Sequence, residues 1–568
     1  MTPACHVVLR IKVIALLFVV MAGVLVWRLF DLQVAQRAFL QDKATARHHR
    51  VIAIPAMRGR ILDRRGEPLA VSAPAVSVWA EPAEVMTASD AQFMALAEAL
   101  AMTPARLSER LVDGAKFVYL RRGLTPRQAQ RIEALQTPGV HRLREYRRYY
   151  PGGEMAAQVV GFTDIDQHGQ EGMERMADAA LRSVSGRRLV VRDLARDVVA
   201  NLGVIDPPRR GGDVRLTLDK RLQYLLYREL KAAVIRHRAR SGMAMLIDAH
   251  NGDVLAAVNQ PSFNPNDRKT FAPARVRNRV FTDAFEPGST MKPLVVLSAL
   301  ASGRFRPDSV IKTAPGRLRI GAHQVVDHRN HGVLTPATVI AKSSNVGAAK
   351  IALAMQPGYL HERLTYLGLG RRTAVRFAGE TGGVLHPYRR WGRLGQATLS
   401  FGYGVSVSVA QLAAAYQVLA NDGVACRLRL AHHEPVRCEL SRFHADDTAT
   451  VRRMMEAVVT PAGTAPKAAI SGYRVAGKTG TVRIAMAGGY AQDRYRALFV
   501  GMAPARRPRL VAVVVVEEPA DNGVYGGVVA APVFARALAP ALRLLNVAPE
   551  SSSDLLLTAS PKPSGDAG

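Results

Sequence analysis

The sequence predicts an α+β protein in three parts. These are a single N-terminal transmembrane helix, an irregular α+β domain, and a C-terminal domain in which a five-stranded antiparallel sheet is flanked by helices and carries a helical insertion. Three observations lead to this prediction: an uncharged apolar run near the N-terminus, short strands and turn residues up to about residue 205, and a regular order of strands and helices after residue 215. With 568 residues, 48% of them apolar, the chain is long enough for separate folded cores.

The apolar run, VIALLFVVMAGVLVW, has 15 uncharged residues from Val13 to Trp27. It covers roughly 22 Å of a ~30 Å hydrocarbon core, so the flanking Lys12 and Arg28 would snorkel. A cleaved signal peptide is the alternative, but no Ala-x-Ala cleavage site follows the run. We therefore expect an anchor over residues 13–30, a short cytoplasmic tail over residues 1–12, and everything after the anchor outside the cytoplasm.

The net charge is strongly positive, with 77 Lys and Arg residues against 46 Asp and Glu residues and a formal excess of +31. Such an excess is typical of nucleic-acid-binding proteins. However, 64 of these cations are arginine, and they are scattered instead of forming a basic arm or stripe. We interpret the charge as a compositional bias and expect no nucleic-acid partner.

The first exported domain is predicted over residues 45–205. It holds no recognisable combination of catalytic residues, which favours a structural or interaction role. The segment PPRRGGD, residues 207–213, predicts a linker at its end. The predicted elements are strands at Val76–Ala80, Phe117–Leu120 and Leu189–Val191, and a helix at Ala91–Leu100.

The second exported domain is predicted over residues 215–547. Two apolar runs joined by Asn251-Gly252 indicate a β-hairpin, and a block of about 215 mostly helical residues separates it from three later strands. Residues 549–568 are predicted to be a disordered tail. The predicted strands are Met243–Asp248, Asp253–Val258, Arg474–Ile484, Tyr495–Met502 and Arg509–Glu517, and the predicted helices are Lys220–Arg236, Met291–Ala301, Val409–Ala420 and Ala530–Leu545.

The cysteines and histidines give no sign of a metal site. There is no CxxC or HExxH pattern, and we interpret Asp327, His328 and His331 as exposed loop residues, so no metal or cofactor is expected. Cys426 and Cys438 flank a predicted turn outside the cytoplasm, where both a disulfide and two free thiols are possible.

The first candidate catalytic pair is Ser289 and Lys292, at the start of a predicted helix. Residues three apart share a helix face, so the amine can reach the hydroxyl. Burial near other cations lowers the pKa of a lysine and allows it to act as a general base. The spacing alone is weak evidence, because Ser309 and Lys312 repeat it in a proline-flanked loop.

Two further motifs follow in an order that makes the pair specific. Ser343-Ser344-Asn345 lies in the helical block, and Lys478-Thr479-Gly480 lies on a predicted strand. A second SxN match, Ser262-Phe263-Asn264, precedes the first pair and sits in a proline-bounded loop. The order SxxK, SxN and KTG is the three-part active site of penicillin-recognising serine enzymes.

Longer stretches extend this resemblance to class B penicillin-binding proteins, and within them to the division-specific FtsI type. The resemblance covers the chain from the anchor to about residue 545, and it makes residues 45–205 a pedestal or dimerisation-type domain and residues 215–547 a transpeptidase domain. Arg58, Asp63 and Gly66 are expected to hold the pedestal fold. The stretches that carry the resemblance are FEPGSTMKP (285–293), KSSN (342–345), GKTGT (477–481), YGGVVAAPVF (525–534), RGRILDRRGEPLA (58–70), RRYYPGGEMAAQ (147–158) and EGME (171–174).

The resemblance also implies a role for each motif residue. Ser289 would be the acyl-accepting nucleophile, Lys292 its general base, Ser343 a proton relay and Asn345 a holder of Lys292 and the substrate amide. The strand would bind substrate, with Lys478 adding positive potential, Thr479 and Thr481 binding the terminal carboxylate of the stem peptide, and Gly480 between them. Backbone N–H groups of Ser289 and Thr481 would form the oxyanion hole.

The implied function is a serine-type D-Ala-D-Ala transpeptidase that cross-links septal peptidoglycan and is acylated by β-lactams. Implied partners are an FtsW-type membrane-embedded glycosyltransferase and other divisome proteins, and the implied location is the inner membrane with a periplasmic catalytic domain. Ser344 stands where class A β-lactamases carry Asp, and no deacylating Glu is recognisable in the sequence, which together favour transfer over hydrolysis. The alternatives are an elongation-specific transpeptidase, a D,D-carboxypeptidase or β-lactamase, and a non-catalytic scaffold or β-lactam sensor.

Overall fold

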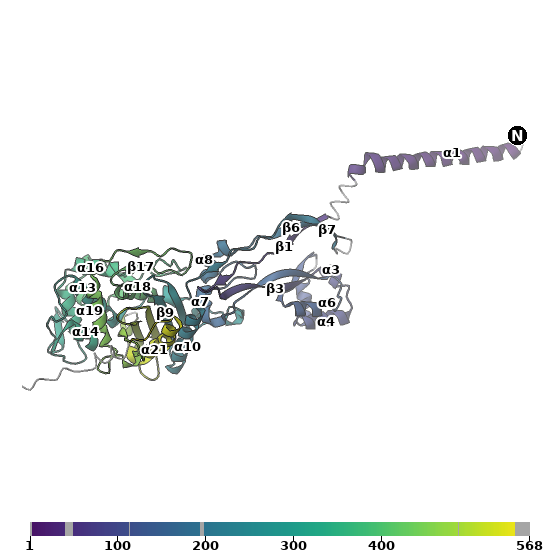
Figure 1. The fold of residues 1–568 in the computed structure, drawn as a ribbon. Helices are drawn as coiled ribbons and strands as arrows, with labels where there is room; N and C mark the ends of the chain where they lie inside the picture. Colours follow the sequence, from purple (N-terminus) through teal and green to yellow (C-terminus); the bar gives the residue numbers. More distant parts are fainter. Residues whose placement is uncertain (1–2, 40–48, 113, 193–197, 487, 551–568) are drawn as a thin grey trace, which may run out of the picture. The chain divides into compact units, whose positions relative to one another are not determined.

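The computed structural model describes residues 3–39, 49–112, 114–192, 198–486 and 488–550 (Figure 1). Of the predicted tail at 549–568, only the first two residues lie within the described part of the chain. The chain divides into two compact units. The first comprises residues 1–57, 75–146 and 183–211, and the second comprises residues 58–74, 147–182 and 212–568.

The N-terminal helix α1 (Pro3–Phe30) continues into a short π-helical turn, η1 (Asp31–Ala35). The stretch Val7–Ala35 is long and apolar enough to cross a membrane, and none of its most apolar window is buried. An unburied helix of this composition is the expected form of a membrane anchor. Gly526–Leu544 also passes this length and composition test, but more than half of its window is buried, as in a core helix.

The first unit contains a three-stranded antiparallel sheet in the order β1, β6, β7. A separate core of apolar side chains is formed by β4, the end of β3 and the short helices between and after them. The predicted strands at 76–80 and 189–191 fall inside β3 and β6, the one at 117–120 begins one residue before β4, and the predicted helix at 91–100 matches α4 to within one residue at each end. The elements are β1 (His49–Ile54), β3 (Pro68–Ala80), α3 (Pro82–Val85), α4 (Asp90–Ala99), α5 (Pro104–Arg110), β4 (Val118–Leu124), α6 (Pro126–Glu133), β5 (Val140–Tyr149), β6 (Gly186–Arg192) and β7 (Val198–Asp206).

Within the second unit, a buried ionic network joins residues 58–74 to residues 147–182. Glu174 is fully buried and receives Arg58 at 2.8 Å and Arg148 at 2.6 Å, both of them also buried. Arg58 also reaches Asp178 at 2.7 Å. Removing one partner of a buried pair leaves an uncompensated charge, so three motifs far apart in the sequence depend on one another.

The main sheet of the second unit is five-stranded and antiparallel, in the order β10, β9, β21, β20, β19, which confirms the predicted fold class. All residues of β9, β10 and β21 are buried, so both faces are covered. Helices α10, α18 and α21 pack on it. The elements are α10 (Lys220–Arg236), β9 (Ser241–Asp248), β10 (Val254–Gln260), α18 (Val409–Ala420), β19 (Ala476–Met486), β20 (Gly489–Ala503), β21 (Leu510–Glu517), α20 (Gly526–Val529) and α21 (Ala531–Leu544).

The helical block lies between β10 and β19, as predicted. Its chief elements are α12 (Arg279–Thr282), η4 (Gly288–Met291), α13 (Lys292–Ala301), α14 (Pro336–Lys342), α15 (Asn345–Leu353), α16 (Pro357–Tyr366), α17 (Arg393–Leu399) and α19 (Ala445–Glu456). The remaining elements are short: β2 (Ile61–Leu62), η2 (Gly153–Ala156), α7 (Ala157–Val160), α8 (Gly172–Met176), α9 (Asp178–Leu181), β8 (Val214–Arg215), η3 (Arg268–Thr270), α11 (Pro273–Val276), β11 (Ile311–Lys312), β12 (Arg317–Ile320), β13 (His323–Val326), β14 (Val333–Leu334), β15 (Val384–Leu385), η5 (Tyr388–Arg390), β16 (Val405–Ser406), β17 (Ala425–Cys426), β18 (Cys438–Glu439) and η6 (Pro466–Ala468).

Cys426 and Cys438 form a disulfide, which decides between the two states left open by the sequence. They are directly paired residues on the antiparallel strands β17 and β18. The loop that the bond closes contacts the segment before α10 and the turn between β9 and β10, because Thr217 N–H donates to Leu430 O and Arg429 pairs with Asp253. The disulfide therefore closes a loop that lies against the first hairpin of the main sheet.

Candidate active site

Ser289 and Lys292 lie at the junction of η4 and α13. The 3₁₀ turn brings residues three apart almost into line, and Lys292 Nζ lies 3.0 Å from Ser289 Oγ. Gly288 begins this turn at φ 56°, a conformation that favours glycine, and a Cβ on the neighbouring Gly402 would lie 2.2 Å from Gly288 O. The turn Gly288–Met291 is thus fixed by backbone packing on both sides, and we call it the nucleophile turn after the role expected for Ser289.

The Lys292 amine is fully buried and surrounded by acceptors. It lies 2.5 Å from Ser343 O, 3.1 Å from Ser343 Oγ and 2.8 Å from Asn345 Oδ1. Burial, with the positive charge of Lys478, lowers the Lys292 pKa well below its ordinary value, and Asp327 opposes this shift. A neutral amine donating its two hydrogens to the two carbonyl oxygens keeps its lone pair for the Ser289 hydroxyl.

Ser343 sits between α14 and α15 and connects both lysines. Its backbone is left-handed, with φ 59° and ψ 37°, a conformation that is uncommon for a residue other than glycine. Its Oγ lies 3.1 Å from Lys292 Nζ and 3.1 Å from Lys478 Nζ. A hydroxyl is both donor and acceptor, so Ser343 can pass a proton between its neighbours.

Asp327 is a site residue that the sequence interpretation missed. We expected an exposed loop residue, and this expectation is wrong, since Asp327 is only 7% exposed. Its carboxylate accepts the Ser344 hydroxyl at 2.6 Å and the backbone N–H groups of Asn345 at 2.5 Å and Val346 at 3.0 Å. A carboxylate at the start of α15 accepts hydrogen bonds from N–H groups that have no partner within the helix, and this orients the SxN segment.

Asn345 is held in the same way on its other side. Its amide Nδ2 donates to Val326 O at 3.2 Å while its Oδ1 faces Lys292. The amide orientation is therefore determined by β13 and Lys292 together.

Lys478 and Thr479 lie on β19, the edge strand of the sheet. Burial lowers the pKa of the fully buried Lys478 to about 7. Its Nζ lies 3.1 Å from Thr479 O and 3.3 Å from Thr479 Oγ1, which in turn contacts Thr464 Oγ1 at 2.8 Å. An edge strand leaves one row of backbone groups free to bind an extended peptide.

Gly480 and Thr481 mark where this strand meets its neighbours. A Cβ on Gly480 would lie 3.2 Å from Pro287 O, so β19 runs directly against the nucleophile turn. Thr481 Oγ1 accepts the Gly526 N–H at 3.1 Å, and its own hydroxyl proton stays available. Gly526 has no room for a side chain, since a Cβ there would lie 2.1 Å from Leu498 O. The YGG segment thus supports the strand from behind.

Glu286 links the rim of the site to the nucleophile turn. One carboxylate oxygen, Oε1, accepts the Gly404 N–H and the Tyr490 hydroxyl, each at 3.0 Å. The Tyr490 ring makes an edge contact with Tyr403, at 5.4 Å between centroids. These contacts tie the β19–β20 hairpin and the 402–404 loop to the segment preceding Ser289.

The decoy motifs do not assemble into a site. Lys312 is exposed on β11, and Ser309 Oγ accepts the Arg306 N–H within its own turn. Ser262 Oγ donates to Glu154 O. Within the described ranges, no three His, Cys, Asp or Glu side chains gather as metal ligands.

Comparison with known proteins finds two family models that match this chain. A model described as "Penicillin binding protein transpeptidase domain" matches residues 242–539, and one described as "Penicillin-binding Protein dimerisation domain" matches residues 53–216.

Relatives cover nearly the full length. The probable peptidoglycan D,D-transpeptidase PbpC of Pseudomonas aeruginosa is 40% identical over 547 residues, covering 96% of this chain and 97% of its own. The peptidoglycan D,D-transpeptidase FtsI of Escherichia coli K12 is 40% identical over 533 residues, covering 93% and 90%. Among solved structures, the transpeptidase domain of Burkholderia pseudomallei penicillin-binding protein 3 gives a TM-score of 0.55 at 42% identity, covering 59% of this chain and 98% of that one.

Proposed function

Because the chain belongs to the class B penicillin-binding proteins, with FtsI-type relatives over most of its length, we propose that it is a peptidoglycan D,D-transpeptidase acting through a Ser289 acyl-enzyme. The observation that carries the assignment to Ser289 is the 3.0 Å contact between its Oγ and the buried Lys292 amine. The family resemblance supplies the substrate class, stem peptides ending in D-Ala-D-Ala. β-Lactams would acylate the same serine.

In the first half-reaction Ser289 Oγ attacks the carbonyl carbon of the penultimate D-Ala. Neutral Lys292 takes the hydroxyl proton, and this assignment is supported by the lowered pKa of Lys292 and by its two carbonyl acceptors. Ser343, in contact with both lysines, passes the proton to the departing D-Ala amine. The C–N bond breaks, free D-Ala leaves, and the peptide remains as an ester on Ser289.

The substrate lies along the β19 edge during this step. Backbone N–H groups of Ser289 and Thr481 stabilise the oxyanion of the tetrahedral intermediate, an assignment supported by the close approach of β19 to the nucleophile turn. Lys478, Thr479 and Thr481 bind the terminal carboxylate. In the second half-reaction an amine of a neighbouring stem peptide attacks the ester, its proton is taken up through Lys292, and Ser289 is regenerated.

A labelled penicillin tests this proposal. Covalent label should be stable in the native chain, absent in Ser289→Ala and retained in Ser309→Ala, which removes the decoy serine. Loss of label in Ser309→Ala alone would overturn the assignment. Rapid release of label would indicate a carboxypeptidase or β-lactamase, and absence of label in the folded native chain would indicate a scaffold or sensor.

The membrane-anchored chain is further proposed to act in septal synthesis. Its single anchor would leave a short cytoplasmic tail and place the catalytic unit in the periplasm, where an FtsW-type glycosyltransferase and other divisome proteins would be its partners. This proposal is supported by α1 and by the FtsI-type relatives. Depletion should give filaments; round cells would instead indicate the elongation role.

A further inference from the structure

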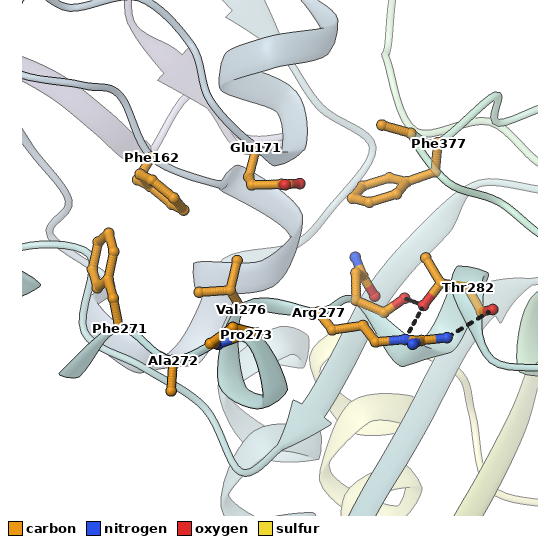
Figure 2. Close-up of a pocket in the computed structure, with 11 residues that line it drawn as sticks. Phe162, Glu171, Phe271, Ala272, Pro273, Val276, Arg277, Thr282 and Phe377 are labelled. Atoms are coloured by element: carbon orange, nitrogen blue, oxygen red, sulfur yellow. Dashed lines mark hydrogen bonds between the residues drawn. The ribbon is translucent and has the colours of Figure 1, made fainter.

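A cavity lies in the second unit, which also carries Ser289, apart from the residues around that serine. Its volume is about 540 Å³, within the usual range for a small-ligand site. None of its lining residues belongs to the site described above. The lining residues come from three segments, 162–171, 271–282 and 377–378. The charged, aromatic and hydroxyl side chains among them are Phe162, Glu171, Phe271, Arg277, Thr282 and Phe377 (Figure 2).

The cavity has a negative end. Glu171 extends its carboxylate toward the space between the phenylalanine rings (Figure 2), and within the described ranges that carboxylate has no hydrogen bond or ion pair. On the opposite side the Arg277 guanidinium is held by Thr282 and by Asp283 at 2.5 Å, an aspartate that also pairs with Arg279 at 2.9 Å. Among the lining residues, Glu171 therefore presents a carboxylate open to a ligand cation, whereas the Arg277 guanidinium is held in its own contacts.

Aromatic rings form the walls beside this carboxylate. Phe162 and Phe271 lie with ring centroids 4.5 Å apart, and Phe377 stacks on Phe281 at 4.7 Å. Ring faces attract cations, and a carboxylate among aromatic rings is the composition with which proteins bind alkylammonium groups. Ala272, Pro273 and Val276 complete an apolar floor.

We propose that this cavity binds a primary ammonium group carried on an apolar chain. The ammonium would pair with Glu171, and its methylene groups would lie against Phe162, Phe271 and Phe377. Resting on the proposed function, the ligand is the side-chain amine of the diamino acid in a peptidoglycan stem peptide, bound away from Ser289. The cavity would hold one stem peptide of a glycan strand while a different stem peptide reacts at Ser289. It would therefore be a non-catalytic subsite.

Calorimetric titration of the full-length chain in detergent tests this. The probe is the tripeptide L-Ala-γ-D-Glu-L-Lys, which lacks D-Ala-D-Ala, and the chain is used both free and after acylation with penicillin. Binding should be equal in both states, at least tenfold weaker in Glu171→Gln, and at least tenfold weaker for the Nε-acetylated tripeptide. Phe271→Leu should weaken binding by several-fold through loss of one ring face.

The matched control is Glu109→Gln, which removes an exposed carboxylate of the other unit and should bind like the native chain. Equal binding by Glu171→Gln or by the acetylated tripeptide would overturn the site. Equal binding by Nα-acetyl-lysine amide would overturn the stem-peptide assignment. Thermal melting of each variant checks folding. Failure of penicillin to label Ser289 would refute the proposed function alone, because titration of the free chain does not depend on it.

Discussion

Replacement of Asp327 by asparagine tests whether the SxN segment is held by a charge. The carboxylate receives three hydrogen bonds from Ser344, Asn345 and Val346, and Asn345 in turn contacts the Lys292 amine. Asparagine has nearly the same shape and keeps one acceptor oxygen. The substitution therefore removes charge while leaving the packing almost unchanged.

The expected loss follows from these bonds. The two backbone N–H groups would pass from a charged acceptor to a neutral one, a difference of roughly 1 kcal/mol each and about 2 kcal/mol together. If this loss of about 2 kcal/mol adds to the activation free energy of acylation, the acylation rate constant decreases about 30-fold. Asp327 also raises the pKa of Lys292, so its neutralisation lowers that pKa further. The base then becomes neutral at a lower pH, and the acid limb of the rate profile moves to lower pH.

The assay is stopped-flow acylation by a chromogenic or fluorescent β-lactam between pH 5 and about 9. A purely structural role for Asp327 would reduce the plateau rate without moving the acid limb. Asp446→Asn is the matched control, since Asp446 is an exposed aspartate in the first turn of α19. An unchanged plateau together with an unmoved limb in Asp327→Asn would refute the reasoning.

Three further predictions concern pH, packing and the disulfide. The rate of acylation of the native chain should rise with pH as Lys292 becomes neutral and fall above about pH 7 as Lys478 loses its charge. Lys478→Arg should abolish the fall. A rate that keeps rising with pH in the native chain would contradict this prediction. Gly526→Ala should lower the free energy of unfolding by about 2 kcal/mol, because its Cβ would lie 2.1 Å from a carbonyl oxygen, and an unchanged thermal midpoint would disprove it. Cys438→Ser should destabilise the catalytic unit by up to about 3 kcal/mol in denaturant unfolding, as reduction of the native chain should, and Cys5→Ser should have no such effect.

Much of the catalytic unit could be predicted from the sequence because its signals are local. Lys220–Arg236 and Val409–Ala420 were predicted as helices with the observed ends, since apolar periodicity and N-capping residues act within a few positions. The structure brings the motif residues into contact, and the spacing within each motif reflects one turn or one strand. The predicted start of the catalytic helix differs only in that Ser289 lies on a 3₁₀ turn preceding α13.

Other features depend on contacts that no local pattern encodes. The sequence around Asp327 has no pattern that distinguishes it from an exposed loop aspartate. Its burial results from the packing of α15 beside β13. Strand β7 escaped prediction because its residues from Val199 to Asp206 are all exposed, which removes the alternation that marks a half-buried strand. The cavity at Glu171 is formed by three distant segments, so only the folded chain reveals it.

The burial of both active-site lysines has a consequence for chemical labelling. The chain holds only 13 lysines against 64 arginines, and Lys292 and Lys478 have no exposed surface. Amine-reactive dyes and surface-immobilisation chemistry will therefore react at the accessible lysines and leave Lys292 and Lys478 unmodified. The folded chain can be attached to a sensor through its amines with its penicillin reactivity intact, whereas the unfolded chain would lose that distinction between lysines.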